Sequence, residues 1–253
     1  MKLLLINPNT TASMTRKAEV AALRVARPDT ELIATNSRSG PPSIEGFYDV
    51  AVCVPGLLEE AAQYRDVDAI IIACFDDTGL DAMRCLFDVP VIGIGEAGYH
   101  AAAVVAHRFS VVTTLSRSVA GITDNLKRYG LIAKCASVRA TDIPVLKLEE
   151  GDPACLADIR SEIAAAIEHD KAEAVVLGCA GMADLMQELS EEFGIPVIDG
   201  ISCAVGMAEA LVAAGLSTSK AGAYAPVVTK RHADQGTGEE IARASAKKGR
   251  SVR

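Results

Sequence analysis

The sequence lacks tryptophan, long apolar runs and an excess of basic residues. Phe, Tyr and Trp together make up 4% of its 253 residues, and no Trp is present. No apolar run approaches the ~20 residues with which a helix spans a bilayer. Lys and Arg number 25 against 33 Asp and Glu, so the net charge of −8 lacks the basic footprint typical of nucleic-acid-binding proteins. We therefore expect neither a membrane partner nor a nucleic-acid partner.

Cysteine is present but sparse. Seven cysteines, an odd number, are spread over the whole chain, which does not fit a small secreted domain held by disulfides. The first apolar stretch ends at Asn7-Pro8 and is too short for the core of a signal peptide. Half of the residues are apolar, enough to bury a sizeable core. These features predict a cytoplasmic globular protein whose cysteines are mostly thiols.

Short apolar runs alternate with helical patterns along the chain. The runs lack the polar alternation of half-exposed strands, which is typical of strands buried on both faces of a parallel sheet. The predicted strands are 2–6, 68–73, 90–94, 110–114, 174–177 and 196–198, and the predicted helices are 12–26, 57–65, 97–107, 119–129, 155–169, 182–193 and 202–214. This order predicts an α/β fold with mainly parallel sheets.

An internal repeat relates two parts of the chain. Three pairs of segments match at nearly constant offsets of 105 to 107 residues: 68–74 with 173–179, 89–93 with 195–199, and 4–7 with 111–114. The repeat predicts two pseudo-symmetric Rossmann-like halves, although buried strands also resemble one another through their shared Val, Ile and Ala. We predict a first half over 1–97, completed by 203–225, a second half over 98–202, and a basic tail over 226–253.

The repeat places Cys74 and Cys179 at the same point in each half, directly after a buried strand. Ligands of open α/β sheets bind beyond the carboxyl ends of the strands, so the two thiols are expected to face one cleft between the halves. A helix beginning after each cysteine would favour the thiolate. Such a pair suits racemisation, in which one thiolate removes a proton from carbon and the other thiol returns one to the opposite face.

The alternative for any cysteine is a small buried hydrophobe. We expect this structural role for the five cysteines that have no matched partner in the other half: Cys53, Cys85, Cys135, Cys155 and Cys203. No C-x-x-C occurs and the four histidines show no ligand spacing, so no metal is expected. Neither a pyridoxal-phosphate lysine nor a dinucleotide loop is supported. Residues 93–98 match the G-x-G-x-x-G pattern of dinucleotide-binding loops, but they come late in the first half and do not follow its first strand. Lys220 is the nearest candidate for a pyridoxal-phosphate lysine and is expected to be structural.

Several motifs together resemble the Asp/Glu racemase superfamily, within it the hydantoin racemase and allantoin racemase branch, over residues 1–225. The motifs are Ile6-Asn7-Pro8-Asn9-Thr10, Ser43-Ile44-Glu45-Gly46, Ala73-Cys74-Phe75-Asp76-Asp77, Phe109-Ser110-Val111-Val112-Thr113-Thr114, Leu177-Gly178-Cys179-Ala180-Gly181-Met182, Pro196-Val197-Ile198-Asp199-Gly200 and Thr218-Ser219-Lys220.

The resemblance implies that Cys74 and Cys179 are the catalytic acid/bases and that no cofactor is needed. It also implies a substrate pocket formed by Asn7, Pro8, Ser43, Phe75, Asp76, Thr113, Thr114, Ala180, Gly181 and Met182. The amino-acid racemases of the superfamily carry Asn-Thr and Thr-His after their two cysteines. These residues are absent here, which argues against free aspartate or glutamate as the substrate. The decarboxylase branch keeps only the second cysteine, so the presence of Cys74 argues against that branch.

Hydantoins suit this chemistry, because the ring carbonyl beside C5 turns the carbanion into an enolate. Its oxygen needs hydrogen-bond donors, which backbone N–H groups after the cysteines and the hydroxyls of Thr113 and Thr114 are expected to supply. Asp76 and Asp77 are expected to raise the pKa of Cys74 above that of Cys179. The resting enzyme is then predicted to hold Cys179 as thiolate and Cys74 as thiol.

The predicted function is the interconversion of the enantiomers of 5-substituted hydantoins, allantoin being one of them, by a homo-oligomer. Few aromatic residues slightly favour a polar substituent, while Phe75, Tyr48 and Met182 leave an apolar pocket open. Two alternatives remain open at this point. One is a maleate-type cis–trans isomerase with a nucleophilic cysteine, and the other is a non-catalytic two-lobed binding protein.

Overall fold

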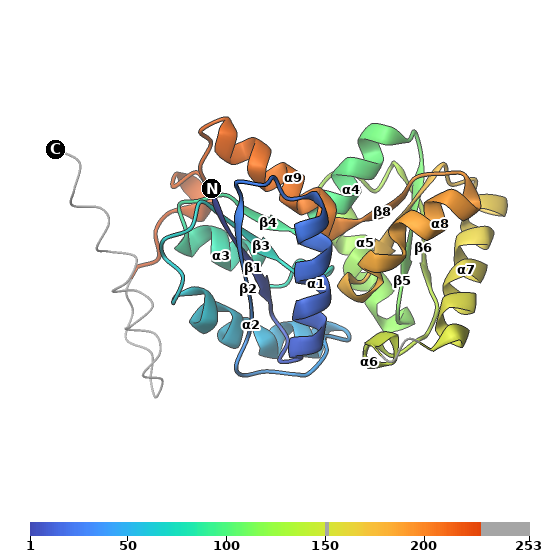
Figure 1. The fold of residues 1–253 in the computed structure, drawn as a ribbon, viewed down its shortest axis with the longest axis horizontal. Helices are drawn as coiled ribbons and strands as arrows, with labels where there is room; N and C mark the ends of the chain where they lie inside the picture. Colours follow the sequence, from blue (N-terminus) through green and yellow to red (C-terminus); the bar gives the residue numbers. More distant parts are fainter. Residues whose placement is uncertain (150–151, 229–253) are drawn as a thin grey trace.

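The computed structural model describes residues 1–149 and 152–228. It contains two four-stranded sheets lying side by side (Figure 1), and every neighbouring pair of strands is parallel. The first sheet has the order β2-β1-β3-β4, and the second has the order β6-β5-β7-β8. The four strands of each half are therefore arranged in the same order, with β5 to β8 in the places of β1 to β4. The predicted α/β fold of two similar halves is confirmed. The strands are β1 (Lys2–Asn7), β2 (Glu31–Asn36), β3 (Ala69–Ile72), β4 (Val91–Gly93), β5 (Phe109–Thr113), β6 (Cys135–Ala140), β7 (Ala174–Gly178) and β8 (Val197–Asp199).

The central strands are almost fully buried. Every residue of β3, β5 and β7 is buried, and so is β1 apart from its first residue. Helices cover both faces of each sheet, which is why these strands are continuous apolar runs without alternation. The sequence did not predict β2 and β6. They are edge strands with partly exposed residues, and their mixed sequences, ELIATN and CASVRA, carry a weaker apolar signal.

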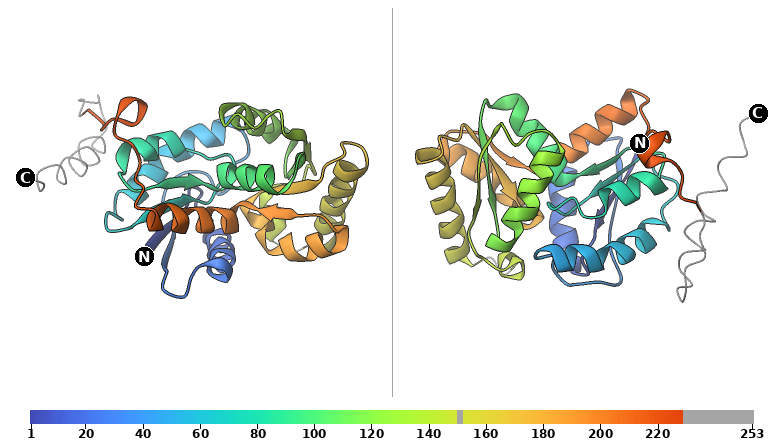
Figure 2. Two further views of the ribbon diagram at one scale, coloured as in Figure 1. Left: turned by 90° about the horizontal axis from the view of Figure 1, so that it is seen from above. Right: turned by 180° about the vertical axis from the view of Figure 1, so that it is seen from behind.

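Helices connect the strands, and two of them, α4 and α9, each pack on the sheet of the other half. Helix α4 follows β4 of the first sheet but packs on β7 and β8 of the second, whereas α9 follows β8 and packs on α1, β3 and β4. Figures 1 and 2 show α4 and α9 meeting between the two sheets. The α-helices are α1 (Ala12–Val25), α2 (Phe47–Ala61), α3 (Leu80–Leu86), α4 (Ile94–Val105), α5 (Val119–Arg128), α6 (Val145–Glu149), α7 (Pro153–Glu168), α8 (Met186–Phe193) and α9 (Gly200–Ala213). Three 3-10 helices accompany them: η1 (Ser116–Ser118), η2 (Ala180–Leu185) and η3 (Gly222–Tyr224).

Small residues allow α4 and α9 to approach each other. A Cβ added at Gly200 would lie 2.1 Å from the carbonyl oxygen of Ile94, so only glycine fits there. A Cβ at Gly98 would lie 3.0 Å from Val176. The predicted boundaries at 97/98 and 202/203 fall inside these two continuous helices, and the division of the chain at those residues stays a prediction.

The segment after α9 is attached to the first half. The backbone N–H of Thr218 donates to the carbonyl of Asp88 at 2.7 Å. The ammonium of Lys220 donates to the carbonyls of Arg84 and Phe87 at 2.6 and 2.8 Å, at the C-terminal end of α3. Lys220 thus satisfies carbonyls that the helix leaves unpaired. Of the predicted basic tail, residues 229–253 lie outside the described residues. Within the described part of the chain, no helix combines the length and apolar character that crossing a membrane requires.

Candidate active site

Both predicted catalytic cysteines line one cavity of about 430 Å³. Cys74 follows β3 and Cys179 follows β7, the equivalent strands of the two sheets, so the parallel topology brings their carboxyl ends to one place. The lining comes from both halves of the chain: Asn9, Met14, Ile44, Ala73, Cys74, Phe75, Asp76, Thr113, Thr114, Ser118, Val145, Gly178, Cys179 and Ala180. The cavity therefore lies at the cleft that the repeat predicted.

The thiol of Cys74 is partly buried beside a carboxylate. Burial is the main cause that raises its pKa well above the ordinary value of a thiol, and repulsion by Asp76 raises the pKa further. Two hydrogen bonds act in the opposite direction, one with the hydroxyl of Thr78 at 3.4 Å and one from the backbone N–H of Asp76. Burial dominates, so Cys74 is protonated at neutral pH.

The two cysteines have different surroundings. The carboxylate of Asp76 lines the cavity, and burial raises its pKa from 3.8 to about 6. In the second half the equivalent position, 105 residues later, is Gly181, which carries no charge. A Cβ at Gly181 would lie 3.6 Å from the sulfur of Cys179. Of the two carboxylates that were expected to act on Cys74, Asp76 lines the cavity and Asp77 does not.

The chain after Cys74 does not form a helix at once, contrary to expectation. Helix α3 begins only at Leu80, and Asp77 and Gly79 have left-handed backbones with φ of +51° and +73°. After Cys179 the short 3-10 helix η2 intervenes before α8. A helix dipole from α3 therefore cannot be aimed at Cys74 as the sequence suggested.

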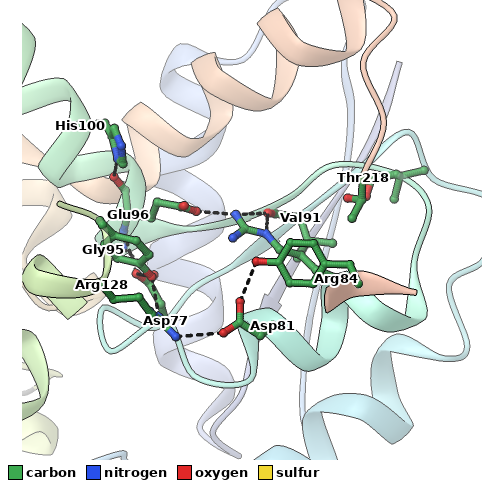
Figure 3. A network of polar contacts seen from close by, with 12 residues as sticks. Asp77, Asp81, Arg84, Val91, Gly95, Glu96, His100, Arg128 and Thr218 are labelled. Atoms are coloured by element: carbon green, nitrogen blue, oxygen red, sulfur yellow. Dashed lines mark hydrogen bonds and ion pairs between the residues drawn. The ribbon is translucent and has the colours of Figure 1, made fainter. Parts of the chain in front are cut away.

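The cause of this turn is the side chain of Asp77. Its carboxylate caps α4 by accepting hydrogen bonds from the backbone N–H groups of Gly95 and Glu96 at 2.9 and 2.8 Å (Figure 3). It also accepts from the hydroxyl of Tyr129 at 2.7 Å. Burial raises the pKa of Asp77 to about 7. The loop that carries Cys74 is thereby fastened to the start of α4, the helix that packs on the second sheet.

Close packing around Asp77 explains the G-x-G-x-x-G pattern. A Cβ at Gly93 would lie 2.0 Å from Oδ1 of Asp77, and one at Gly95 would lie 2.3 Å from the carbonyl oxygen of Phe75. These glycines leave room for the Cys74 loop rather than for a nucleotide. Beyond them, Glu96 pairs with Arg84, which also donates to the carbonyl of Val91 (Figure 3).

Helix α5 of the second half holds the same loop from a second direction. The side-chain amide of Asn125 donates to the carbonyl of Asp76 at 2.9 Å. One turn later, Arg128 pairs with Asp81 at 3.1 Å (Figure 3). With Tyr129, these contacts fix the position of Cys74 relative to the half that carries Cys179.

The two threonines at the end of β5, Thr113 and Thr114, line the cavity, but one hydroxyl is already engaged. Oγ1 of Thr113 donates to the carbonyl of Gly178 at 3.0 Å. A Cβ at Gly178 would lie 2.7 Å from the Cβ of Thr113, so glycine is needed for this approach. The hydroxyl of Thr113 can accept a hydrogen bond from a ligand, but its proton is committed to the protein. Donation to an enolate is left to Thr114 and to amide N–H groups.

Some predicted residues lie outside the lining of this cavity. They are Asn7, Pro8, Ser43, Gly181 and Met182. Asn7 is buried behind the first loop, where its amide donates to Oδ1 of Asn9 at 2.9 Å and to the hydroxyl of Thr15 at 3.1 Å. Ser43 donates to Glu45 at 3.2 Å, and Met182 is buried in the core of the second half. Their part in substrate binding stays a prediction.

Other lining residues were not predicted. Met14, Ile44, Ser118 and Val145 have side-chain types without chemical signature, and only the fold brings them to the cavity. Ile44 had one available signal, its place in the Ser43-Ile44-Glu45-Gly46 motif.

Asn9 had a clearer signal, since it belongs to the first-loop motif. Its Oδ1 accepts from the amide of Asn7 and from the backbone N–H of Thr11 at 2.9 Å each. These bonds fix the orientation of the side chain, whose Nδ2 faces the sulfur of Met14 at 3.5 Å. A thioether is a weak acceptor. Nδ2 of Asn9 can therefore donate to a ligand in the cavity.

Two hydrogen bonds join α6, which carries the lining residue Val145, to the first half. The backbone N–H of Val145 donates to Oε1 of Glu45 at 3.1 Å, and the ammonium of Lys17 donates to the carbonyl of Leu148 at 3.2 Å. No cluster of three or more His, Cys, Asp or Glu side chains suited to a metal ion occurs among the described residues.

Known proteins resemble this chain over most of its length. Residues 3–208 match the family described as Asp/Glu/Hydantoin racemase. A hydantoin racemase from Rhizobium meliloti is 49% identical over 227 residues, which cover 89% of this chain and 94% of the relative. A hydantoin racemase from Pseudomonas sp. (strain NS671) is 43% identical over 226 residues, covering 88% and 91%.

Solved structures agree with these sequence relatives. An allantoin racemase from Klebsiella pneumoniae superimposes with a TM-score of 0.91 at 44% identity, covering 94% of this chain and 98% of that one. The predicted resemblance is confirmed, and this chain belongs to the Asp/Glu/Hydantoin racemase family.

Proposed function

We propose that this protein is a cofactor-independent racemase that interconverts the enantiomers of 5-substituted hydantoins, allantoin included. The observation that carries the proposal is the pair of thiols, Cys74 and Cys179, which line one cavity from equivalent strands of the two halves. Support also comes from relatives at 43–49% identity that are named hydantoin racemases and from a solved allantoin racemase at 44% identity.

In the proposed mechanism one sulfur acts as base and the other as acid. The thiolate of Cys179 removes the proton from C5, and the C–H electrons move into the ring carbonyl to form an enolate. The thiol of Cys74 then gives its proton to the opposite face of C5, leaving a Cys74 thiolate and a Cys179 thiol. The opposite enantiomer reacts in the reverse sense, which restores the starting protonation.

The asymmetry around the two sulfurs supports this assignment of the resting state. Burial and Asp76 raise the pKa of Cys74 well above its usual range, which favours its thiol form. Cys179 faces neutral Gly181 at the equivalent position. The Cys74 thiolate formed after one turnover is unfavourable beside Asp76, so we infer that reprotonation of Cys74 resets the enzyme readily.

The remaining lining suits a compact heterocycle. Nδ2 of Asn9 is oriented to donate to a ring carbonyl, where negative charge develops in the enolate. Met14, Ile44 and Val145 supply apolar walls that limit contact with water. In such surroundings a hydrogen bond to a developing charge is stronger than in water.

The test measures loss of optical rotation from L-5-methylhydantoin and from (S)-allantoin, with no metal or pyridoxal phosphate added. We expect Cys74→Ser and Cys179→Ser each to slow racemisation by about 100-fold or more, the usual scale for losing a general acid or base. Cys85→Ser is the matched control, because Cys85 does not line the cavity. Unaltered rates in both cavity variants would refute the proposed mechanism.

A further inference from the structure

A second cavity of about 490 Å³ adjoins the catalytic one. Asp76 and Ser118 line both, so the two cavities lie next to each other at these residues. The other lining residues come from the start of α2 and from the η1–α5 segment: Gly46, Phe47, Val50, Arg117, Gly121, Asp124 and Asn125. Nothing in the proton-transfer mechanism requires this space.

The walls of this second cavity are largely apolar. The side chain of Phe47 is 64% exposed, which is unusual for a phenylalanine beside a functional cavity. A Cβ at Gly46, whose φ is +101°, would lie 3.3 Å from Cδ of Arg117. The methylene groups of Arg117 therefore pack against the loop before Phe47, and Val50 adds a further aliphatic surface.

Gly121 keeps this cavity open. It is the third residue of α5, a position where alanine is more favourable than glycine, and its φ is not in the left-handed region. Within the described part of the chain, the one atom that its added Cβ would meet within 4 Å is Cε1 of Phe47, at 3.6 Å. A longer side chain at 121 would extend across the face of Phe47. The glycine thus preserves empty space beside an aromatic ring.

We infer that the second cavity receives the substituent at C5 of the hydantoin and selects an apolar, ring-bearing group such as benzyl. The inference rests on the proposed function, because C5 must lie between the two sulfurs in the first cavity. A substituent leaving C5 past Asp76 and Ser118 enters the second cavity directly. A bound ring would cover Phe47 and gain ring–ring packing.

The experiment compares kcat/KM for L-5-benzylhydantoin and L-5-methylhydantoin in the wild type and in Gly121→Leu. We expect the wild type to prefer the benzyl compound by about tenfold or more. Gly121→Leu should lower kcat/KM for the benzyl compound by at least tenfold and alter the methyl compound by less than twofold. Gly206→Leu is the matched control, because Gly206 is also helical but exposed, with no atom of the described residues within 4 Å of an added Cβ.

The outcomes separate this inference from the proposed function. Racemisation of both compounds with no selective loss in Gly121→Leu would overturn the substituent site and leave the racemase standing. Equal losses for both compounds would also overturn it, since the leucine would then act on the fold or on C5. If the wild type racemises neither compound, the proposed function fails and the substituent site falls with it. Phe47→Ala gives an independent measurement, with a selective rise in KM expected for the benzyl compound.

Discussion

Asp76 is expected to destabilise the folded protein at neutral pH. Burial raises its pKa from 3.8 to about 6, so the folded state binds a proton at this carboxyl more tightly than the unfolded chain does. The favourable contribution is present in acid and is lost as the pH rises from about 4 to about 6. Above pH 6 the folded protein holds Asp76 as a partly buried carboxylate, and burying this charge lowers the free energy of unfolding.

The magnitude follows from the shift of about two pKa units. At 1.36 kcal/mol per unit, Asp76 costs about 3 kcal/mol of unfolding free energy at pH 7.5 and about 1 kcal/mol at pH 4.5. Asp76→Asn keeps the shape and removes the charge. We expect it to stabilise the protein by about 2–3 kcal/mol at pH 7.5 and by less than half of that at pH 4.5.

Urea unfolding of the wild type and Asp76→Asn at both pH values measures this difference. Asp158→Asn is the matched control, since Asp158 is exposed on α7, and it should change stability little at either pH. The neighbouring Asp77 titrates in both proteins, so its effect cancels in the comparison. A gain that is equal at the two pH values, or a loss at pH 7.5, would refute the assignment of this cost to the charge of Asp76.

Three further predictions concern the neighbourhood of the site. Removing the negative charge in Asp76→Asn should lower the pKa of Cys74, because repulsion by Asp76 helps to raise it. We expect alkylation of Cys74 by iodoacetamide at pH 8 to become faster by about threefold or more, because the gain in thiolate outweighs its lower nucleophilicity. Peptide mapping by mass spectrometry measures the rate, and an unchanged rate would contradict the prediction. Lys220→Met should lower the unfolding free energy by about 2 kcal/mol through lost charged hydrogen bonds, with kcat little changed, as denaturant titration and a rate assay will determine. Gly93→Ala should cost about 3 kcal/mol and most of the racemase activity, because its Cβ would lie 2.0 Å from the carboxylate of Asp77; a stable, active variant would show that the loop can move.

The fold was largely predictable because its central strands repeat. Residues 69–72 and 174–178 are buried, and burial restricts both segments to the same apolar pattern. Edge strands such as β2 and β6 face solvent in part and are free to vary, so the pattern did not identify them. Helix α2 was predicted only from residue 57, although it begins at Phe47, because its first turns are partly exposed and mixed in character.

The candidate site was predictable where it depends on strand ends. Cys74, Cys179, Thr113 and Thr114 lie at strand ends or within two residues of them, so the topology brings them together. Val145 reaches the cavity through a loop whose path depends on tertiary contacts, such as its hydrogen bond to Glu45 100 residues away. No local pattern in the sequence encodes such a pairing.

The turn after Cys74 shows a different limit. The residues that follow the cysteine were expected to start a helix. Asp77 instead caps α4, eighteen residues further on, and this choice is settled by the close approach that Gly93 and Gly95 permit. Capping residues are recognisable in a sequence, but the helix that each one caps is decided by packing.

The most direct test of the two-thiol account follows deuterium at C5 in D₂O. Each enantiomer of 5-methylhydantoin is incubated separately with the wild type, Cys74→Ser and Cys179→Ser, and both deuterium content and configuration are measured. The account predicts that the wild type racemises both enantiomers with deuterium entering C5, while each variant exchanges only the enantiomer whose C5–H faces the remaining thiol and racemises neither. Racemisation by either variant at the wild-type rate, or racemisation by the wild type without deuterium uptake, would contradict it.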